Sequence, residues 1–213
     1  MTAVKPSKDD VVAAYRRGAL LAAARGVFGA NGFEQATMDA IAEEAGVAKG
    51  TIYLYYPSKQ SIYDATFAAG TAELTRLTDA QVEAAPNPRS AIAAFVQARV
   101  SYFQEFPDYF RMYVIELSRI VIGLGPRQGG CRVAVEDHTR ALQRAIEQAA
   151  ARGEVRAVDP AAAALAVFDI TRGLVARRLL TGAKSDATRD IDFITDLIWA
   201  GLQPVSGAQG HPA

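Results

Sequence analysis

The chain has 213 residues, 50% of them apolar, and its 23 basic residues are balanced by 23 acidic ones. This length and apolar content are enough to bury a core in one or two domains. The zero net charge provides no bulk attraction to nucleic acid, so any DNA-binding function must come from a local arrangement of residues.

The chain contains one cysteine, Cys131, so no internal disulfide is expected. No run of 18 uncharged apolar residues is present, which predicts a protein without a membrane partner. The first residues, MTAVKPSKDD, lack the apolar region of a secretory signal. These features predict a cytoplasmic protein.

The pattern along the chain predicts an all-α fold of about nine helices. Alanine is abundant, strand-like alternation is absent, and Gly and Pro fall at intervals that suit helix ends. The expected helices cover residues 10–30, 37–45, 48–55, 58–84, 88–105, 107–122, 131–152, 159–181 and 186–202, each to within a few residues. They are expected to form a first domain over 10–57 and a second over 58–203, with flexible tails at 1–9 and 204–213.

Local signals place several of these helix ends. Asn31-Gly32 is a good stop for the first helix, and Thr37 can cap the second through its hydroxyl. Gly46 then breaks the second helix, and Asp159-Pro160 is a cap followed by proline at the first helical position. A helix, a glycine-centred turn and a helix over residues 37–55 have the proportions of a helix-turn-helix, although many helical proteins contain such a corner.

The first turn of the third helix carries chemistry that suits DNA. Lys49, Gly50 and Thr51 stand at its start, the part of a recognition helix that reaches base edges. A lysine can donate to the O6 and N7 acceptors of guanine, and a threonine offers a hydroxyl to phosphate and a methyl to thymine. The glycine lets the backbone approach the duplex closely.

Tyrosines in the same helix suit the phosphate backbone. Tyr53 and Tyr55 lie on its exposed side if Ile52 and Tyr56 face inward, and a phenol can donate its O–H to a phosphate oxygen. Two further expected phosphate contacts are Thr37 and Lys59.

The segment that contains these residues resembles a known family. The run FGANGFEQATMDAIAEEAGVAKGTIYLYYPSKQSIYDA, residues 28–65, is similar to the DNA-binding domain of the TetR family of bacterial transcription regulators. The resemblance implies an all-helical homodimer that binds a palindromic operator. It also implies a second domain that binds a small effector and usually releases the operator when it does so, which makes repression the default and leaves activation open.

The resemblance also implies roles for single residues. Lys49, Gly50, Thr51 and Leu54 would face bases, and Thr37, Tyr53, Tyr55 and Lys59 would hold phosphates. Leu54 departs from the family, which often has a larger or polar side chain there, and this makes base readout at that position apolar or absent.

The second domain offers candidates for an effector pocket. Aromatic residues are dense over 95–113, where they suit either a core or the wall of an apolar cavity. Solvated positions are the favoured interpretation for Arg99, Glu116 and Arg172, with an inward position beside a ligand as the alternative. The candidate pocket residues are Phe67, Arg99, Phe103, Tyr113, Glu116, Phe168 and Arg172. An apolar or aromatic effector is expected from this content, and the candidate arginines also permit an anion.

The last two helices are the candidate dimer interface. The helix over 186–202 carries one apolar stripe with Ile191, Ile194 and Ile198 and a second with Phe193 and Leu197, so it needs two partners. Gly173 in the preceding helix allows another helix to approach closely. The alternative is that both helices pack inside one subunit.

Three side chains have no assigned role. A solvated helix face is the favoured position for His138, and Cys131 is expected to have no functional role. Trp199 suits either the dimer interface or the core.

The main rival interpretations are an enzyme and a helical ligand-binding or interaction protein without operator binding. The glycine-rich stretches lack the spacing of nucleotide-binding loops, and two histidines and one cysteine far apart make no metal site. The sequence therefore predicts no enzyme, no metal and no cofactor. The intact Lys49-Gly50-Thr51 and the tyrosines favour the DNA-binding regulator.

Overall fold

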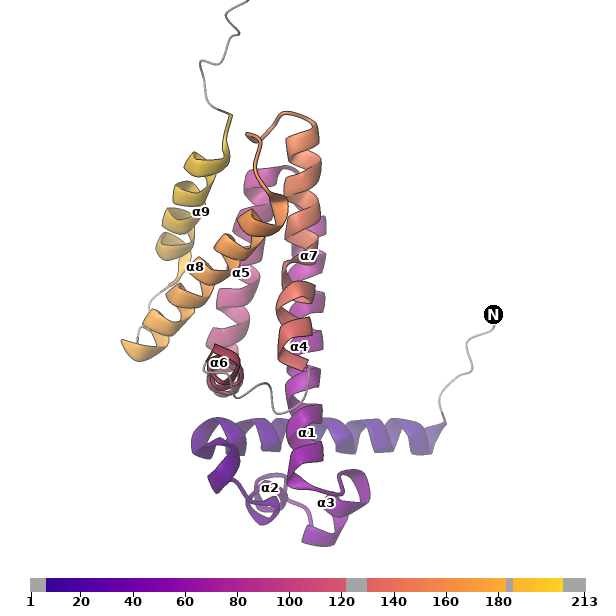
Figure 1. The fold of residues 1–213 in the computed structure, drawn as a ribbon. Coiled ribbons are helices and arrows are strands. Elements are labelled where there is room, and N and C mark those ends of the chain that lie inside the picture. The colour runs from indigo at the N-terminus through magenta and orange to yellow at the C-terminus, as the bar shows by residue number, and fades with distance from the viewer. Residues whose placement is uncertain (1–6, 122–129, 183–185, 205–213) are drawn as a thin grey trace, which may run out of the picture. The chain divides into compact units, whose positions relative to one another are not determined.

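The computed structural model describes residues 7–121, 130–182 and 186–204, and those residues form nine helices and no strand. The expected all-α fold is confirmed (Figure 1). The helices are α1 Lys8–Gln35, α2 Met38–Glu44, α3 Lys49–Tyr55, α4 Lys59–Glu83, α5 Pro88–Glu105, α6 Pro107–Val121, α7 Gly130–Ala151, α8 Pro160–Leu180 and α9 Thr188–Leu202. The predicted flexible tails lie mostly outside the described residues.

Helix α1 is longer than expected at both ends. Its start is fixed by a reciprocal capping box, in which Asp10 N–H donates to Ser7 Oγ at 3.1 Å and Ser7 N–H donates to Asp10 Oδ2 at 3.0 Å. Near its end, Gly32 has a φ of 71°, which only glycine adopts readily, and this non-helical residue interrupts the helix. The predicted stop therefore locates a kink, after which a short stretch continues to Gln35.

The predicted caps of α2 and α8 are confirmed. Thr37 Oγ1 accepts a hydrogen bond from Ala40 N–H at 3.1 Å, and Asp159 Oδ1 accepts one from Ala161 N–H at 2.9 Å. Each bond satisfies a backbone donor that has no partner within the first turn of its helix. The caps therefore fix where these two helices begin.

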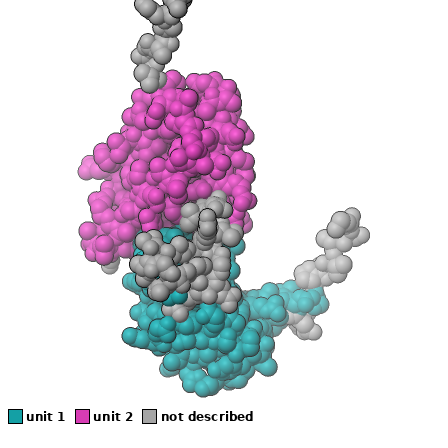
Figure 2. Space-filling model, in the orientation of Figure 1, with its two compact units in different colours: residues 1–72, 106–131 teal, residues 73–105, 132–213 magenta. Residues whose placement is uncertain are grey.

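Two compact units divide the chain (Figure 2), with residues 1–72 and 106–131 in unit 1 and residues 73–105 and 132–213 in unit 2. Helix α4 therefore contributes to both units. This division differs from the boundary expected at residue 57, because the first half of α4 and helix α6 pack together with the first three helices. The functional boundary at residue 57 stays a prediction.

The core of unit 1 joins the first three helices to the start of α4 and to α6. Its fully buried side chains include Leu20, Phe28, Ile41, Ile52 and Ile62. Helix α6 approaches α1 closely, and a Cβ built on Gly29 would lie 2.4 Å from Asp108 Cβ. Only glycine fits at this contact without a shift of the backbone.

Unit 2 is a helical bundle in which α5 packs against both α8 and α9. Helices α8 and α9 are also joined by an ion pair, in which Arg178 Nη1 donates to Asp190 Oδ2 at 2.7 Å. Hydrogen bonds donated by Arg178 and, to a smaller extent, by Arg177 lower the pKa of the Asp190 carboxyl group. In the described part of the chain, no helix is long and apolar enough to cross a membrane.

Candidate nucleic-acid interface

Helix α3 is attached to unit 1 by one side and presents the other to solvent. Ile52 is fully buried against the core, whereas Tyr53 is 44% exposed and Leu54 is 83% exposed. Lys49 and Gly50, in the first turn, are exposed as well. The helix has only seven residues, and Ile52 is the one that is buried. Most of its surface therefore remains free to contact another molecule.

Thr37 lies at the start of α2 and is exposed. Its Oγ1 is occupied as an acceptor by the capping bond to Ala40 N–H, but its hydroxyl hydrogen is still available to donate. A phosphate oxygen is an acceptor of the kind that this hydroxyl can serve. The geometry therefore allows Thr37 to cap its helix and bind phosphate at the same time.

Lys49 is held by the preceding helix. Its Nζ lies 2.8 Å from Oδ1 and 2.9 Å from Oδ2 of Asp39, in the first turn of α2. The hydrogen bond to Asp39 and the charge of that carboxylate raise the pKa of Lys49. Asp39 was not among the residues predicted to act at this surface. An acidic residue in the first turn of α2 and a basic residue in the first turn of α3 form the sequence pattern from which this ion pair could have been predicted.

Tyr55 differs from its predicted position. It is half-buried and packs against the core of unit 1, and the Arg17 guanidinium lies 5.9 Å from the centroid of its ring. Tyr56, predicted to face inward, is also half-buried, and this burial raises the pKa of its phenol. Both rings are drawn inward because the short helix ends beside α1, which leaves Tyr53 as the exposed tyrosine of α3.

Lys59 is engaged within unit 1. Its Nζ donates to the carbonyl oxygens of Glu34 at 3.1 Å and Ala36 at 3.0 Å, and it lies 4.6 Å from the centroid of the Phe33 ring. These carbonyls belong to the end of α1, where backbone acceptors lack helical donors. The predicted phosphate contact by Lys59 therefore competes with a structural role in closing α1.

The candidate effector residues divide between the two units. In unit 2, the Arg99 guanidinium lies 5.5 Å from the ring centroid of Phe103 and 4.5 Å from that of Phe168. Arg99 is fully buried, so the favoured solvated position was wrong. Aromatic faces attract a cation, so these rings favour the burial of the Arg99 charge.

In unit 1, the other inward candidates lie on α4 and α6. Glu116 is 3% exposed, again contrary to the favoured solvated position, and its Oε1 accepts a hydrogen bond from Tyr63 at 2.7 Å. Phe67 and Tyr113 stack with centroids 6.2 Å apart. Arg172 joins neither group, because it is partly exposed on α8 and pairs with Asp169 at 3.0 Å.

His138 is also buried rather than solvated, which corrects the favoured interpretation. It is fully buried in unit 2, with Nδ1 2.8 Å from Thr75 Oγ1. Burial, together with the charge of Arg99, lowers the pKa of His138 to about 3. Cys131 lies in α7, but its side chain falls outside the described residues, and Trp199 is half-buried.

The predicted dimer residues of α9 point largely into their own unit. Ile191 and Ile194 are 4% and 8% exposed, so they pack within the subunit, and Ile198 is half-buried. The second stripe is the outward one, with Phe193 66% and Leu197 58% exposed. The rotation of α9 about its own axis, where it packs on α5, decides which stripe is covered, and the sequence pattern alone does not fix that rotation.

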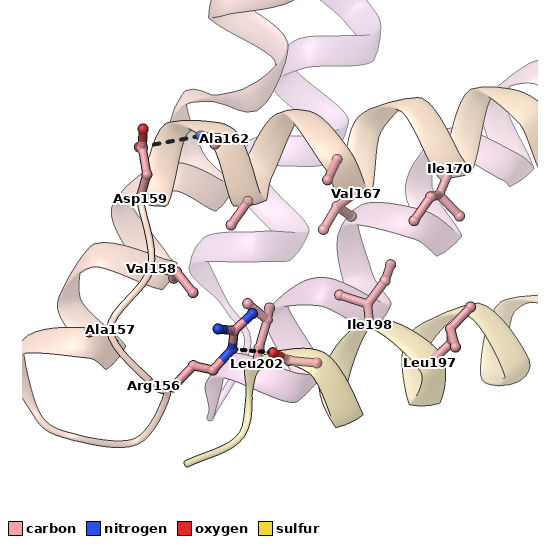
Figure 3. A pocket seen from close by; sticks show the side chains of 13 residues that line it. Arg156, Ala157, Val158, Asp159, Ala162, Val167, Ile170, Leu197, Ile198 and Leu202 are labelled. Carbon is pink, nitrogen blue, oxygen red and sulfur yellow. Dashed lines mark hydrogen bonds between the residues drawn. The ribbon is translucent and has the colours of Figure 1, made fainter. Parts of the chain in front are cut away.

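An apolar groove of about 490 Å³ lies between α8 and α9. Val167 and Ile170 of α8 face Leu197 and Ile198 of α9 across it, and Arg156 donates to the Gly201 carbonyl oxygen at one end (Figure 3). Gly173 of α8 is exposed, and a Cβ there would meet nothing within 4 Å. This face of unit 2 is therefore apolar, hollowed and open.

Comparison with known families agrees with this architecture. The family profile described as "Bacterial regulatory proteins, tetR family" matches residues 20–66. The profile "AefR-like transcriptional repressor, C-terminal domain" matches residues 109–194. The first match includes the exposed third helix, and the second includes most of α6 and all of α7 and α8.

Curated relatives match about half of this chain. The uncharacterized HTH-type transcriptional regulator YhgD of Bacillus subtilis is 30% identical over 112 residues, 48% of this chain and 59% of the relative. The HTH-type transcriptional activator FasR of Mycolicibacterium smegmatis is 31% identical over 97 residues, 46% of this chain and 44% of the relative. The chain thus spans about half the length of these relatives.

Solved structures share the fold over most of the chain. A transcriptional regulator FadR from Bacillus subtilis, in complex with stearoyl-CoA, has a TM-score of 0.71 at 20% identity, covering 86% of this chain and 98% of that one. A TetR family regulator from Marinobacter aquaeolei VT8 has a TM-score of 0.73 at 19% identity, covering 90% and 97%. At such identities the likeness establishes the fold.

The helical fold, the capped α2 and the outward-facing α3 define a helix-turn-helix protein. The profile matches at both ends of the chain specify it further, and the chain belongs to the TetR family of transcriptional regulators.

Proposed function

We propose that this protein is a cytoplasmic, ligand-responsive repressor that binds a palindromic operator as a homodimer and is released by a small apolar or aromatic effector. The exposed face of α3 is the observation that carries the proposal. Lys49, Gly50, Tyr53 and Leu54 face solvent together on a helix anchored from behind by Ile52. Lysine suits guanine edges, and tyrosine suits phosphates.

Selection of binding sites from a random duplex library at low salt tests this proposal. We expect a palindromic site whose half-sites are about 34 Å, one helical turn, or a multiple of that apart. Recovery of no palindrome would favour the alternative of a helical ligand-binding protein without operator binding.

Two variants then test the roles within α3. Lys49→Ala should relax base preference at one position and cost about 1–3 kcal/mol of binding free energy on the selected site. Tyr53→Phe should weaken binding to all duplexes similarly, because a phosphate contact is independent of sequence. Titrations against the selected site and its single-base variants separate the two effects, and the reverse pattern would contradict the assignment.

The open groove between α8 and α9 supports a twofold dimer. Large apolar side chains on both helices are exposed in one subunit, including Leu165, Ile170, Phe193 and Leu197. Burying such a surface against a second copy removes it from water and gives a self-complementary interface. We expect a species of about 45 kDa in sedimentation, twice the 22.7 kDa of one chain.

The aromatic surroundings of Arg99 support the effector class. Phe103 and Phe168 supply apolar surface in unit 2, and the guanidinium supplies a positive charge. Long-chain acyl-CoA thioesters are a sensible first probe, because the structurally similar regulator FadR was solved with stearoyl-CoA. Release of the selected operator by stearoyl-CoA, compared with free coenzyme A and with benzoate, measures whether the acyl chain, the nucleotide portion or an aromatic acid is recognised.

A further inference from the structure

The ion pair between Lys49 and Asp39 lies across the turn of the helix-turn-helix. Asp39 stands in the first turn of α2, and Lys49 is the first residue of α3. The lysine nitrogen contacts both carboxylate oxygens, at 2.8 and 2.9 Å. Their side chains are 61% and 62% exposed, so the pair lies on the surface that we propose to face DNA.

The fold does not need this pair. Helices α2 and α3 are already joined by the buried side chains of Ile41, Ala42 and Ile52, and α2 has its own cap in Thr37. Ion pairs at such exposed positions contribute little to stability, since solvent screens both charges. A role at the surface is therefore the better explanation for the contact.

Asp39 and DNA compete for the same lysine. An ammonium group carries one positive charge and three N–H donors, and here the carboxylate balances that charge and accepts from the nitrogen. Guanine edges and phosphate oxygens are acceptors too, and phosphates are repelled by a neighbouring carboxylate. Lys49 can bind DNA at full strength only when Asp39 releases it.

We propose that Asp39 restrains DNA binding by occupying Lys49, so that the protein binds every duplex more weakly than α3 alone would allow. This inference rests on the proposed function, because it assumes that the exposed face of α3 contacts DNA. It assigns Asp39 as a residue that sets affinity by acting through Lys49, without a favourable contact of its own to the operator.

Fluorescence anisotropy with labelled duplexes tests the proposal on the full-length protein. The selected operator and a random duplex of the same length are titrated with wild type, Asp39→Asn, Lys49→Ala and the double variant. We expect Asp39→Asn to bind both duplexes about two- to tenfold more tightly, the range for release of an exposed ion pair and removal of one repulsive charge. In the Lys49→Ala background, the same substitution should give a clearly smaller gain, because only the removal of the repulsive charge remains.

Salt dependence gives a second readout. If Asp39→Asn frees Lys49 for one more phosphate on the random duplex, the slope of log K against log salt should steepen by about 0.9. Glu43→Gln is the matched control. Glu43 is likewise an exposed carboxylate of α2, and in the described residues the ion pair of Lys49 is formed with Asp39 instead.

The outcomes separate clearly. Weaker operator binding by Asp39→Asn would mean that Asp39 positions Lys49 rather than restrains it, and would overturn the proposal. An equal gain in Glu43→Gln, or an undiminished gain in the Lys49→Ala background, would show that the tighter binding comes only from the loss of a negative charge near DNA. Either result would also overturn the proposal. Wild-type protein that binds no duplex would overturn the proposed function, and this inference with it, whereas wild-type binding without a gain in Asp39→Asn overturns the inference alone.

Discussion

Leu54 is an apolar side chain that is largely exposed to solvent on the helix that we propose to face DNA. It is 83% exposed, although its neighbour Ile52 is completely buried. Leucine has no hydrogen-bonding group, so it cannot read the donors and acceptors of a base pair. The major groove offers it one apolar partner, the C5-methyl group of thymine.

We therefore expect Leu54 to favour thymine at one position of each half-site. Replacing that thymine by uracil removes only the methyl group and should weaken wild-type binding by about fourfold, corresponding to about 0.8 kcal/mol for one buried methyl. Leu54→Ala should bind the thymine and uracil operators equally well. Equal sensitivity of the two proteins in anisotropy titrations would show that Leu54 does not contact the methyl.

His138 makes stability depend on pH. Its pKa in the folded protein is about 3, below the ordinary value of 6.5, because it is buried and lies in the field of Arg99. Between these values the unfolded chain binds a proton that the folded chain does not, so stability falls as the pH falls through this window.

Replacing His138 by asparagine should remove this pH dependence. From pH 7 to pH 5, the wild type should lose about 2 kcal/mol of unfolding free energy more than His138→Asn loses, the value for one proton over about 1.5 pH units. Urea titrations at both pH values measure the difference. Identical losses in the two proteins would mean that His138 is protonated in the folded state.

At the scale of helices, the contact between α1 and α6 depends on one missing side chain. A Cβ on Gly29 would lie 2.4 Å from Asp108 Cβ and 2.7 Å from Asp108 Cα and O, none of which is a flexible side-chain end. Gly18 lies in the same helix, but a Cβ there would meet nothing within 4 Å. The two glycines therefore provide a matched pair.

Gly29→Ala should destabilise the protein by about 1–3 kcal/mol, because the helices must separate to admit the methyl group. Gly18→Ala should stabilise it by about 0.5–1 kcal/mol, since alanine loses less conformational entropy in a helix. Chemical denaturation of both variants checks the signs, and destabilisation by Gly18→Ala or stability unchanged by Gly29→Ala would contradict this account.

At the scale of the whole molecule, the groove between α8 and α9 leaves an apolar surface open to solvent in the single subunit. Leu197 lines this groove and is 58% exposed, so the dimer that we propose would bury this apolar side chain. Leu197→Asp would instead place a carboxylate in an apolar interface, and an unpaired buried charge is strongly unfavourable.

We expect Leu197→Asp to sediment as a 22.7 kDa monomer at micromolar concentration. Asp192→Asn, an exposed change on another side of α9, should leave the dimer intact. Because two half-sites must be bound together, the monomeric variant should also lose most of its operator affinity. A dimeric Leu197→Asp protein would place the interface elsewhere.

The sequence by itself determined the helices and the third-helix surface. Caps such as Thr37 and Asp159, and breaks such as Gly32 and Gly46, act within a few residues, so helix ends could be predicted to within a few positions for most elements. Ile52 and Leu54 take opposite sides of a short helix by periodicity alone.

Only the tertiary structure decided what each side chain meets from distant parts of the chain. Asp39 reaches Lys49, and Lys59 closes the end of α1 instead of standing free for phosphate. Arg99 and His138 look like solvated helix residues in sequence, yet both are buried. Ile194 and Leu197 belong to equally apolar stripes, and the packing of α9 on α5 buries one and exposes the other. Burial and pairing depend on how helices are placed against each other, and local sequence signals do not encode that placement.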